Sequence, residues 1–456
     1  MAADPARPGA TPGATRLRPG SPAFTVLLGA LAALPPLSID LNLPALPGLA
    51  ASFGAAPQAA AATLSAFMAG FALAQLVHGP ASDRFGRRPV LLLGLAVYAA
   101  AGLACALAPT LPALVAWRAV QGAGAGAGLV LSRAVVRDLF PDPARARVQF
   151  SYMNAVTQVA PVVAPLLGGV VLVASGGAWR PIFAVLALSG VALLAAVWAG
   201  LGESAPALDP AALRPGRLLA NYRRFLGARE CLGNALVAGC TFGCLFGYVT
   251  GSSLVFVATL GFSPVAYAAT FAGVSACIIA GSFASASLAR RGAAPRRVVR
   301  FALAAACAGC VAAVAALSGV APIPALPLLV PSLGLVTFCF GLVMPTAVQG
   351  ALQPMPDMAG VGSAVLGCLQ MLGGAASSAA VGALFGPLGA VAMPAVMLAC
   401  VLLALAAHEA VARPARRPSA GTRAPAPTAG REDRPNTAAD ARAPPRHDGP
   451  RPEETV

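Results

Sequence analysis

Charged side chains are scarce in this chain. Only 10% of its 456 residues are Asp, Glu, Lys or Arg, whereas about 25% of the residues in a soluble domain are charged. Apolar residues make up 58% of the sequence, and the mean hydropathy is +0.76. This shortage of charge excludes an ordinary soluble domain and predicts a protein that crosses a membrane several times.

Groupings that would indicate catalysis or a bound metal are also missing. Cys307 and Cys310 form a C-x-x-C pattern, but they lie in an alanine-rich apolar run without further ligands, which is typical of packing. The alternate glycines of segment 122–128 follow no strand, so they indicate close helix packing rather than a phosphate loop. No Ser–His–Asp grouping emerges. We expect neither an enzyme nor a bound cofactor or metal.

Long apolar runs dominate what is present, and they lack the alternation of β-strands. Because a membrane helix needs about 20 apolar residues, and because only helices or closed barrels pair all their backbone groups in lipid, we interpret the runs as helices. The sequence predicts twelve, at residues 23–44, 60–82, 89–108, 111–132, 150–174, 179–200, 232–256, 264–289, 298–318, 324–348, 360–385 and 389–410.

The predicted helices divide into two sets of six. The segment 201–231 separates a bundle at 22–200 from a bundle at 232–410, and the loops 79–89 and 285–300 echo each other. Two six-helix pseudo-repeats are the arrangement of one large transporter fold. The tails 1–21 and 411–456 are rich in Pro, Ala and Arg, and they are predicted to be disordered.

Arginine predicts the orientation. Lysine is absent, so all 31 basic residues are arginine, and the net charge is +15. Apart from Arg118 and Arg180, every arginine lies in a tail or in a loop on the same side of the membrane. The positive-inside rule therefore predicts that both termini are cytoplasmic. Anionic lipid attracts this charge, so the lipid bilayer is the expected partner and no nucleic acid is required.

Residues 78–89, HGPASDRFGRRP, form the most specific segment of the sequence. Its glycines allow a tight turn, and Asp83 can pair with the neighbouring arginines or lie against a helix N-terminus. The alternative is an ordinary basic loop that obeys the topology. The candidate residues of this loop are Gly79, Asp83, Arg84, Gly86, Arg87 and Arg88.

The segment GPASDRFGRRP closely resembles the signature between the second and third helices of the major facilitator superfamily. LVAWRAVQGAGAGAG (114–128), APVVAPLLGG (160–169) and AWRPIF (178–183) resemble motifs of its fourth, fifth and sixth helices. Together with PLSIDLNLPALP and AGVGSAVLGCLQ, the set resembles the bicyclomycin-resistance (Bcr/CflA) group of drug:proton antiporters over most of residues 22–410. Two departures are Ala164, in place of a glycine, and Asn42, in place of an aromatic residue.

Asp40 and Arg118 are the only strong charges inside the predicted spans and away from their ends. A charge in the middle of a membrane helix costs at least about 2.5–3.5 kcal/mol, so such a group indicates function and a partner. At 1.5 Å per residue, both lie roughly 9–10 Å below the same surface. We therefore predict that Asp40 carries protons and pairs with Arg118, as the resemblance also implies. The alternative is a static ion pair.

Other polar and aromatic side chains are candidates for a substrate cavity. Asn154 and Gln158 lie four residues apart on one helix face, either in the cavity or as hydrogen-bonding contacts between helices. Phe67 with Phe71, and Phe242 with Phe246, have helical spacing and could line a drug site or pack in the core. Asn42, two residues after Asp40, completes this set.

The resemblance implies an all-α integral membrane protein of the bacterial inner membrane, with the major facilitator fold. It implies a monomeric antiporter that exports drugs such as phenicols, bicyclomycin or sulfonamides in exchange for protons, with the proton gradient as its energy source. Loop 79–89 would be a cytoplasmic latch, and the antiporter helix with Ala164, Pro165, Gly168 and Gly169 would limit leak. The alternatives are a facilitative or proton-driven transporter of a small metabolite and a membrane protein that transports nothing.

Overall fold

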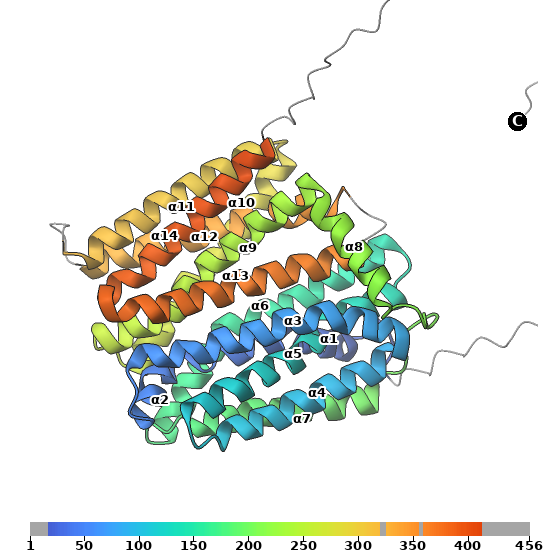
Figure 1. Cartoon of the computed structure of the whole chain (residues 1–456), viewed down its shortest axis with the longest axis horizontal. Coiled ribbons are helices and arrows are strands. Elements are labelled where there is room, and N and C mark those ends of the chain that lie inside the picture. Colours follow the sequence, from blue (N-terminus) through green and yellow to red (C-terminus); the bar gives the residue numbers. More distant parts are fainter. Residues whose placement is uncertain (1–16, 320–324, 355–358, 413–456) are drawn as a thin grey trace, which may run out of the picture. The chain divides into compact units, whose positions relative to one another are not determined.

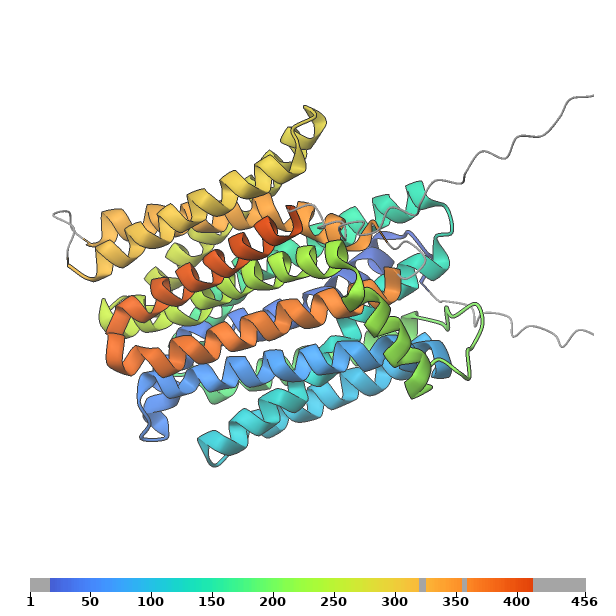
Figure 2. The same cartoon turned by 45° about the horizontal axis from the view of Figure 1, so that its top comes forward.

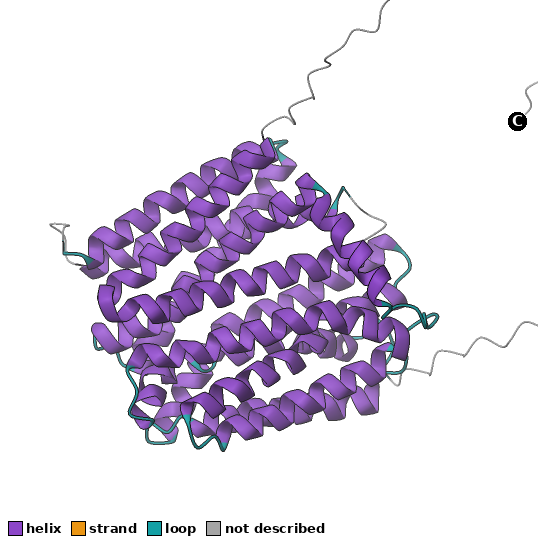
Figure 3. Cartoon of the chain, in the orientation of Figure 1, coloured by secondary structure: helices purple, strands orange, loops and turns teal. Residues whose placement is uncertain are grey.

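The computed structural model describes residues 17–319, 325–354 and 359–412, and every regular element in these ranges is a helix (Figure 1, Figure 3). Twelve helices have 19 to 32 residues. They are α1 (Pro22–Asp40), α3 (Ala61–Phe85), α4 (Arg87–Ala106), α5 (Leu111–Leu139), α6 (Pro143–Ala174), α7 (Arg180–Gly200), α9 (Arg229–Ser253), α10 (Pro264–Arg290), α11 (Pro295–Leu317), α12 (Ala325–Leu352), α13 (Ala359–Leu388) and α14 (Ala392–Ala412). The prediction of an all-α protein with twelve long helices is confirmed.

Most of these helices are apolar enough to span a bilayer. Ten apolar stretches of the described chain have the necessary length, and one of them, Val361–Val411, covers most of both α13 and α14. Helix α6 adds the shorter apolar segment Val159–Ala174. The predicted tails 1–21 and 411–456 lie outside the described residues, except for residues 17–21 and 411–412.

The helices form two sets that follow the order of the chain. Helices α1 and α3 to α7 pack with one another, and α9 to α14 pack with one another (Figure 1, Figure 2). We call these sets the N-terminal and C-terminal halves. The halves meet where α3 contacts α13 and where α6 contacts α10. The connecting segment contains helix α8 (Pro215–Gly227), which the apolar runs do not reveal because three arginines interrupt its apolar residues.

Helix α1 ends earlier than predicted, at Asp40 rather than at residue 44. Pro44 explains the difference, because it has no N–H to donate to the Asp40 carbonyl and its ring would clash with that carbonyl in a continuing helix. The chain instead forms the single 3₁₀ turn η1 (Leu43–Ala45) and then the short helix α2 (Leu46–Ser52). Asp40 is therefore the last residue of its helix, not a residue inside one.

Glycines allow α3 and α5 to approach closely. A Cβ atom at Gly122 of α5 would lie 1.9 Å from the carbonyl oxygen of Phe67 in α3, and a Cβ atom at Gly70 of α3 would lie 1.9 Å from the carbonyl oxygen of Ala119 in α5. Small residues that let two backbones meet are typical of membrane helix interfaces. The glycine run 122–128 thus packs helices, as the sequence indicates.

Replacing Gly122 by alanine should destabilise the folded protein by about 1–3 kcal/mol, because the new methyl group overlaps the backbone of Phe67 and the helices must separate. Thermal unfolding in detergent would measure the change. Gly273→Ala in α10 is the control, since a Cβ atom added there would have no other atom within 4 Å and alanine favours the helix. Equal melting temperatures for the two variants would contradict this account of the α3–α5 contact.

Candidate functional site

The two ends of the helical bundle differ in how the halves meet. The Asp40 end contains residues 41–60, 254–263 and 389–391, whose turns and short helices touch one another across the halves. The loop end contains Gly86 and the segment 201–228. At the Asp40 end, the Ser378 hydroxyl of α13 donates to the Ala61 carbonyl of α3 at 3.4 Å. The turn η1 there contacts α9 and α10. The halves are thus in contact across the Asp40 end.

Asp40 is buried in this contact, with only 5% of its surface exposed. Among the described residues, no arginine or histidine forms an ion pair with Asp40. Its electrostatic neighbours are the hydroxyl groups of Tyr248 in α9 and Tyr267 in α10. The carboxyl group of the N-terminal half therefore lies within electrostatic range of two tyrosines of the C-terminal half.

Arg118 of α5 is fully buried in the N-terminal half. Its Nη1 donates to Gln121 Oε1 at 2.7 Å, and its Nη2 donates to the Ser38 carbonyl at 3.1 Å. Its guanidinium carbon lies 4.3 Å from the ring centre of Phe67 and 5.6 Å from that of Phe183. The Ser38 carbonyl is in the last turn of α1, where carbonyls lack helical partners and a positive charge is favourable.

The predicted pair between Asp40 and Arg118 is not formed in this structure. The two residues do lie at neighbouring depths, because Arg118 bonds to Ser38, two residues before Asp40. The early end of α1 exposes a backbone carbonyl to the guanidinium, and this acceptor takes the place expected for the carboxylate.

Asn42 also lies in the contact at the Asp40 end. It is fully buried, and neither its side-chain oxygen nor its side-chain nitrogen has a hydrogen-bond partner. The hydroxyl group of Tyr248 is buried and unpartnered as well. Buried polar groups are nearly always paired in native proteins, so Asn42 and Tyr248 are exceptions in this structure.

The predicted aromatic residues form two separate pairs. Phe67 and Phe71 are stacked, with ring centres 6.5 Å apart, and both are fully buried in the N-terminal half, where Phe67 supports Arg118. Phe242 and Phe246 of α9 are stacked at 4.9 Å in the C-terminal half. Phe246 reaches the interface, since it packs at Gly374 beside Met68 of α3. No ring contact between the two pairs occurs among the described residues.

Helix α6 runs unbroken through Pro161 and Pro165. Ala164 is fully buried, and Gly168 is pressed against the chain next to Asp40, because a Cβ atom there would lie 2.1 Å from the Leu41 carbonyl oxygen. Gly169 faces the Pro264 carbonyl of α10, with its Cβ position 3.5 Å away. This helix thus connects the Asp40 turn to the C-terminal half. The side chains of Asn154 and Gln158 lie outside the described residues.

Segment 79–89 is mostly helical, which corrects the predicted loop. Only Gly86, with φ of +98°, separates α3 from α4. Arg87 is buried and bonds to Ser82 at 2.6 Å, to Asp138 of α5 at 2.9 Å, and to Asp83. The remaining candidates lie around this centre: the Gly79 carbonyl accepts from the Ser82 hydroxyl, Arg84 lies over the Phe85 ring, and Arg88 donates to the Trp198 carbonyl.

Glu203, which the sequence analysis missed, anchors this cluster to the connecting segment. Its carboxylate accepts from the backbone N–H groups of Arg87 at 2.8 Å and Arg88 at 3.2 Å. It therefore caps the N-terminus of α4, where a negative charge is favourable. The cluster joins elements of the N-terminal half to the segment that follows α7.

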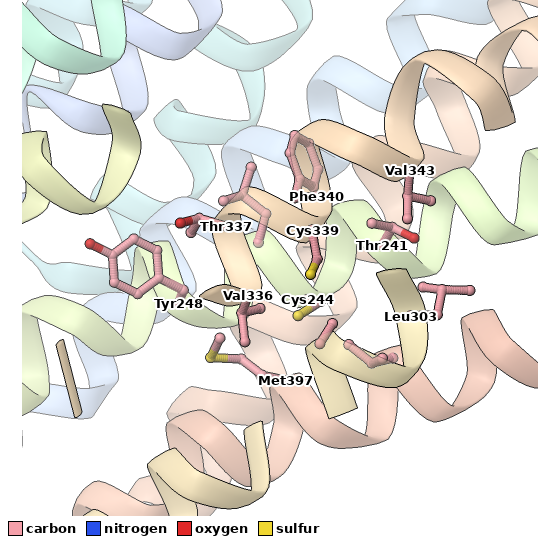
Figure 4. A pocket seen from close by; sticks show the side chains of 13 residues that line it. Thr241, Cys244, Tyr248, Leu303, Val336, Thr337, Cys339, Phe340, Val343 and Met397 are labelled. Carbon is pink, nitrogen blue, oxygen red and sulfur yellow. The ribbon is translucent and has the colours of Figure 1, made fainter. Parts of the chain in front are cut away.

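A small cavity lies within the C-terminal half, between α9, α11, α12 and α14 (Figure 4). Its volume of about 10 Å³ suits a single water, whereas ligand pockets have about 300–1,000 Å³. Cys244 and Cys339 line it. Tyr248 lies at its edge, with the hydroxyl group directed away from the two sulfurs (Figure 4).

Comparisons with known proteins agree with this architecture. Residues 28–378 match the profile of the Major Facilitator Superfamily. The chain is 34% identical over 362 residues to the uncharacterized MFS-type transporter YdgK of Bacillus subtilis, covering 79% of this chain and 88% of the relative. Among solved structures, it is similar in fold to a bacterial homolog of the human lysosomal transporter Spinster, with a TM-score of 0.65, 16% identity, and coverage of 86% and 97% of the two chains.

Two further relatives have names that refer to drug resistance. The chain is 34% identical to the bicyclomycin resistance protein homolog of Haemophilus influenzae, over 52% of this chain and 59% of the relative. It is 33% identical to the multidrug resistance protein MdtL of Escherichia coli, over 55% and 63%. Both alignments cover less than two thirds of the relative. The match to the superfamily profile extends over most of the chain, and the chain therefore belongs to the Major Facilitator Superfamily and is a multi-pass membrane carrier of small molecules.

Proposed function

We propose that this carrier is a proton-coupled antiporter that exports small amphipathic drugs across the bacterial inner membrane. The observation that carries the proposal is Asp40, a carboxyl group buried between the two halves without an ion pair among the described residues. The relatives named for bicyclomycin and multidrug resistance support drugs as substrates. The arginine distribution supports cytoplasmic termini, and therefore a cytoplasmic loop end and a periplasmic Asp40 end.

Burial of Asp40 supports coupling to protons. An ionised carboxylate in the closed interface costs several kcal/mol, whereas a protonated carboxyl group costs much less. A proton taken from the periplasm would therefore favour closure of the Asp40 end, and loss of that proton to the cytoplasm would favour its opening. A ligand that binds from the loop end and favours proton release then moves outward as protons move inward, which is antiport.

The energy source in this proposal is the proton gradient, with no bound cofactor, and the transport unit is a monomer. The residues proposed to contact the drug are Asn42, Phe67, Phe71, Asn154, Gln158, Phe242 and Phe246. Phe246 has the strongest support, because it lies at the interface beside Met68. Arg118 would affect proton coupling through its hydrogen bond to the end of α1. The polar cluster around Gly86, centred on Arg87, would act as the cytoplasmic latch. Helix α6 would close the interface at Gly168 and Gly169.

The test uses inverted membrane vesicles that contain the protein and hold a preset pH gradient, acidic inside. Addition of a phenicol, bicyclomycin or a sulfonamide should release protons from vesicles with the carrier and not from matched vesicles without it. Drug uptake into the vesicles should stop when an ionophore removes the gradient. Uptake that continues unchanged without the gradient, or that moves no protons, would show a facilitative carrier and reject the proposal.

A further inference from the structure

The contact at the Asp40 end contains a free hydrogen-bond donor next to the proposed proton carrier. Tyr248 of α9 is 1% exposed, and its hydroxyl group has no partner. Asp40 is close enough to act electrostatically on that hydroxyl group. The turn that follows Asp40 touches α9, the helix of Tyr248. Two buried polar groups from different halves thus lie within electrostatic range of each other at this end.

The position of Tyr248 is well defined. Its ring stacks on Phe271 of α10, with the ring centres 5.4 Å apart and the planes 10° apart, and its hydroxyl group is directed away from the cavity in the C-terminal half (Figure 4). Tyr267 also packs against Phe271, tilted and at 5.9 Å, but its hydroxyl group lies 2.9 Å from Ser252 Oγ and is satisfied. Of the two tyrosines within electrostatic range of Asp40, only Tyr248 has a hydroxyl group without a hydrogen-bond partner.

The other charged and titratable groups near Asp40 come from several elements. From α5, both Nη atoms of Arg118 donate, to Gln121 and Ser38, while its Nε is buried without a partner. From α6, the residue against this turn is Gly168, which has no titratable group. From α10, Tyr267 lies within electrostatic range of Asp40, and Cys277 lies within that range of Tyr248. Among the unpartnered donors here, those of Asn42 and Arg118 belong to the N-terminal half, and Tyr248 supplies one from the C-terminal half.

We propose that Tyr248 is a positioning residue for proton release, and that its hydroxyl group donates a hydrogen bond to the Asp40 carboxylate across the two halves. This inference rests on the proposed role of Asp40 as the proton carrier. A hydrogen bond from a hydroxyl group to a carboxylate is stronger than one to a neutral carboxyl group. The hydroxyl group of Tyr248 thus lowers the cost of the ionised form while the Asp40 end is still closed.

The contact also couples the proton to movement of α9. Helix α9 continues, after Ser253, into the π-helical segment η3 (Leu254–Thr259), which contacts α2 of the N-terminal half. Such π-helical segments occur frequently at functional sites. A bond between Asp40 and Tyr248 links the end of α1 to this segment. Formation and loss of the bond can therefore affect the contact between the two halves at the Asp40 end.

The Tyr248→Phe variant tests this inference, because it keeps the ring on Phe271 and removes only the hydroxyl group. The pH midpoint of drug-triggered proton release should move upward by about one unit, as expected for the loss of one hydrogen bond to a charged group. The Tyr222→Phe variant is the control, because its hydroxyl group bonds to the Leu76 carbonyl at the loop end, and it should keep the wild-type midpoint. An unchanged midpoint in Tyr248→Phe, with Asp40→Asn inactive, would reject Tyr248 and leave the antiporter proposal intact.

Infrared difference spectra of the reconstituted protein give a second test of the bond between Tyr248 and Asp40, and this test does not require transport. A pH step should show the carboxyl band of Asp40, identified by its absence in Asp40→Asn, and this band should shift in Tyr248→Phe but not in Tyr222→Phe. A band at the same frequency in wild type and Tyr248→Phe would overturn the inference. Wild-type vesicles that release no protons on drug addition would instead reject the proposed function.

Discussion

Replacement of Asp40 by asparagine should abolish drug-triggered proton release and leave the protein folded. The amide has nearly the same shape as the protonated carboxyl group, but it cannot take up or release a proton. It is also uncharged, so it avoids the cost of about 2.5–3.5 kcal/mol for a charge inside the membrane, and the closed Asp40 end should be at least as stable as in wild type. The measurement is the drug-induced collapse of a preset pH gradient in inverted vesicles, together with a melting curve.

Two variants separate loss of the titrating group from general damage. Asp40→Glu keeps a carboxyl group and should keep part of the proton release. Asp209→Asn removes a half-exposed acid in the connecting segment, which pairs with Arg217 at 2.6 Å, and should respond like wild type. If Asp40→Asn responds like wild type, Asp40 has a structural role and the carrier is uncoupled or coupled through another group.

The separation of Asp40 from Arg118 supports the expectation that Asp40 takes up and releases protons. A carboxylate held in a permanent ion pair would bind protons weakly, because the pair stabilises its charged form. In the structure the guanidinium is bonded to Gln121 and to the Ser38 carbonyl instead. Asp40 is then governed by its burial between the two halves. Movement of the halves changes this burial, so the charge of Asp40 can follow the conformation.

The helices could be predicted from the sequence because each apolar run must span a bilayer and pair its own backbone groups. The bounds of α7 and α10 were predicted to within one residue, at 179–200 and 264–289 against Arg180–Gly200 and Pro264–Arg290. The predicted end of α1 was wrong because the length of an apolar run indicates where residues are apolar, not where helical hydrogen bonds end. Pro44 was the available signal, since a proline four residues after Asp40 removes the donor for its carbonyl.

The partners of the candidate residues were harder to predict. Two isolated charges suggested an ion pair, but a backbone carbonyl at a helix end competes for a guanidinium, and the sequence does not reveal which acceptor is nearer. Glu203 lies 116 residues from Arg87, and Tyr248 lies in the opposite half from Asp40, so no local spacing connects them. Only the packing of the helices brings these side chains together.

Arg118→Lys should reduce proton-coupled drug transport by more than tenfold and lower the melting temperature, although the positive charge is kept. Lysine has no planar fork, so it cannot donate to Gln121 and Ser38 while it stacks on Phe67. Loss of one charged hydrogen bond costs about 1.5–3 kcal/mol, which corresponds to roughly a 10- to 100-fold change. Proton release and drug binding should be measured on the same vesicles, with coupling expected to fall more than binding.

Arg180→Lys is the matched control for this substitution. Arg180 also donates to a backbone carbonyl, that of Ala108 at 3.3 Å, and also lies over an aromatic ring, that of Trp179 at 4.9 Å. It is exposed at the start of α7 rather than buried beside the end of α1. Water can therefore donate any hydrogen bond to the carbonyl that lysine fails to make. Equal losses of coupling in the two variants would mean that the contact between Arg118 and Ser38 has no special part in transport.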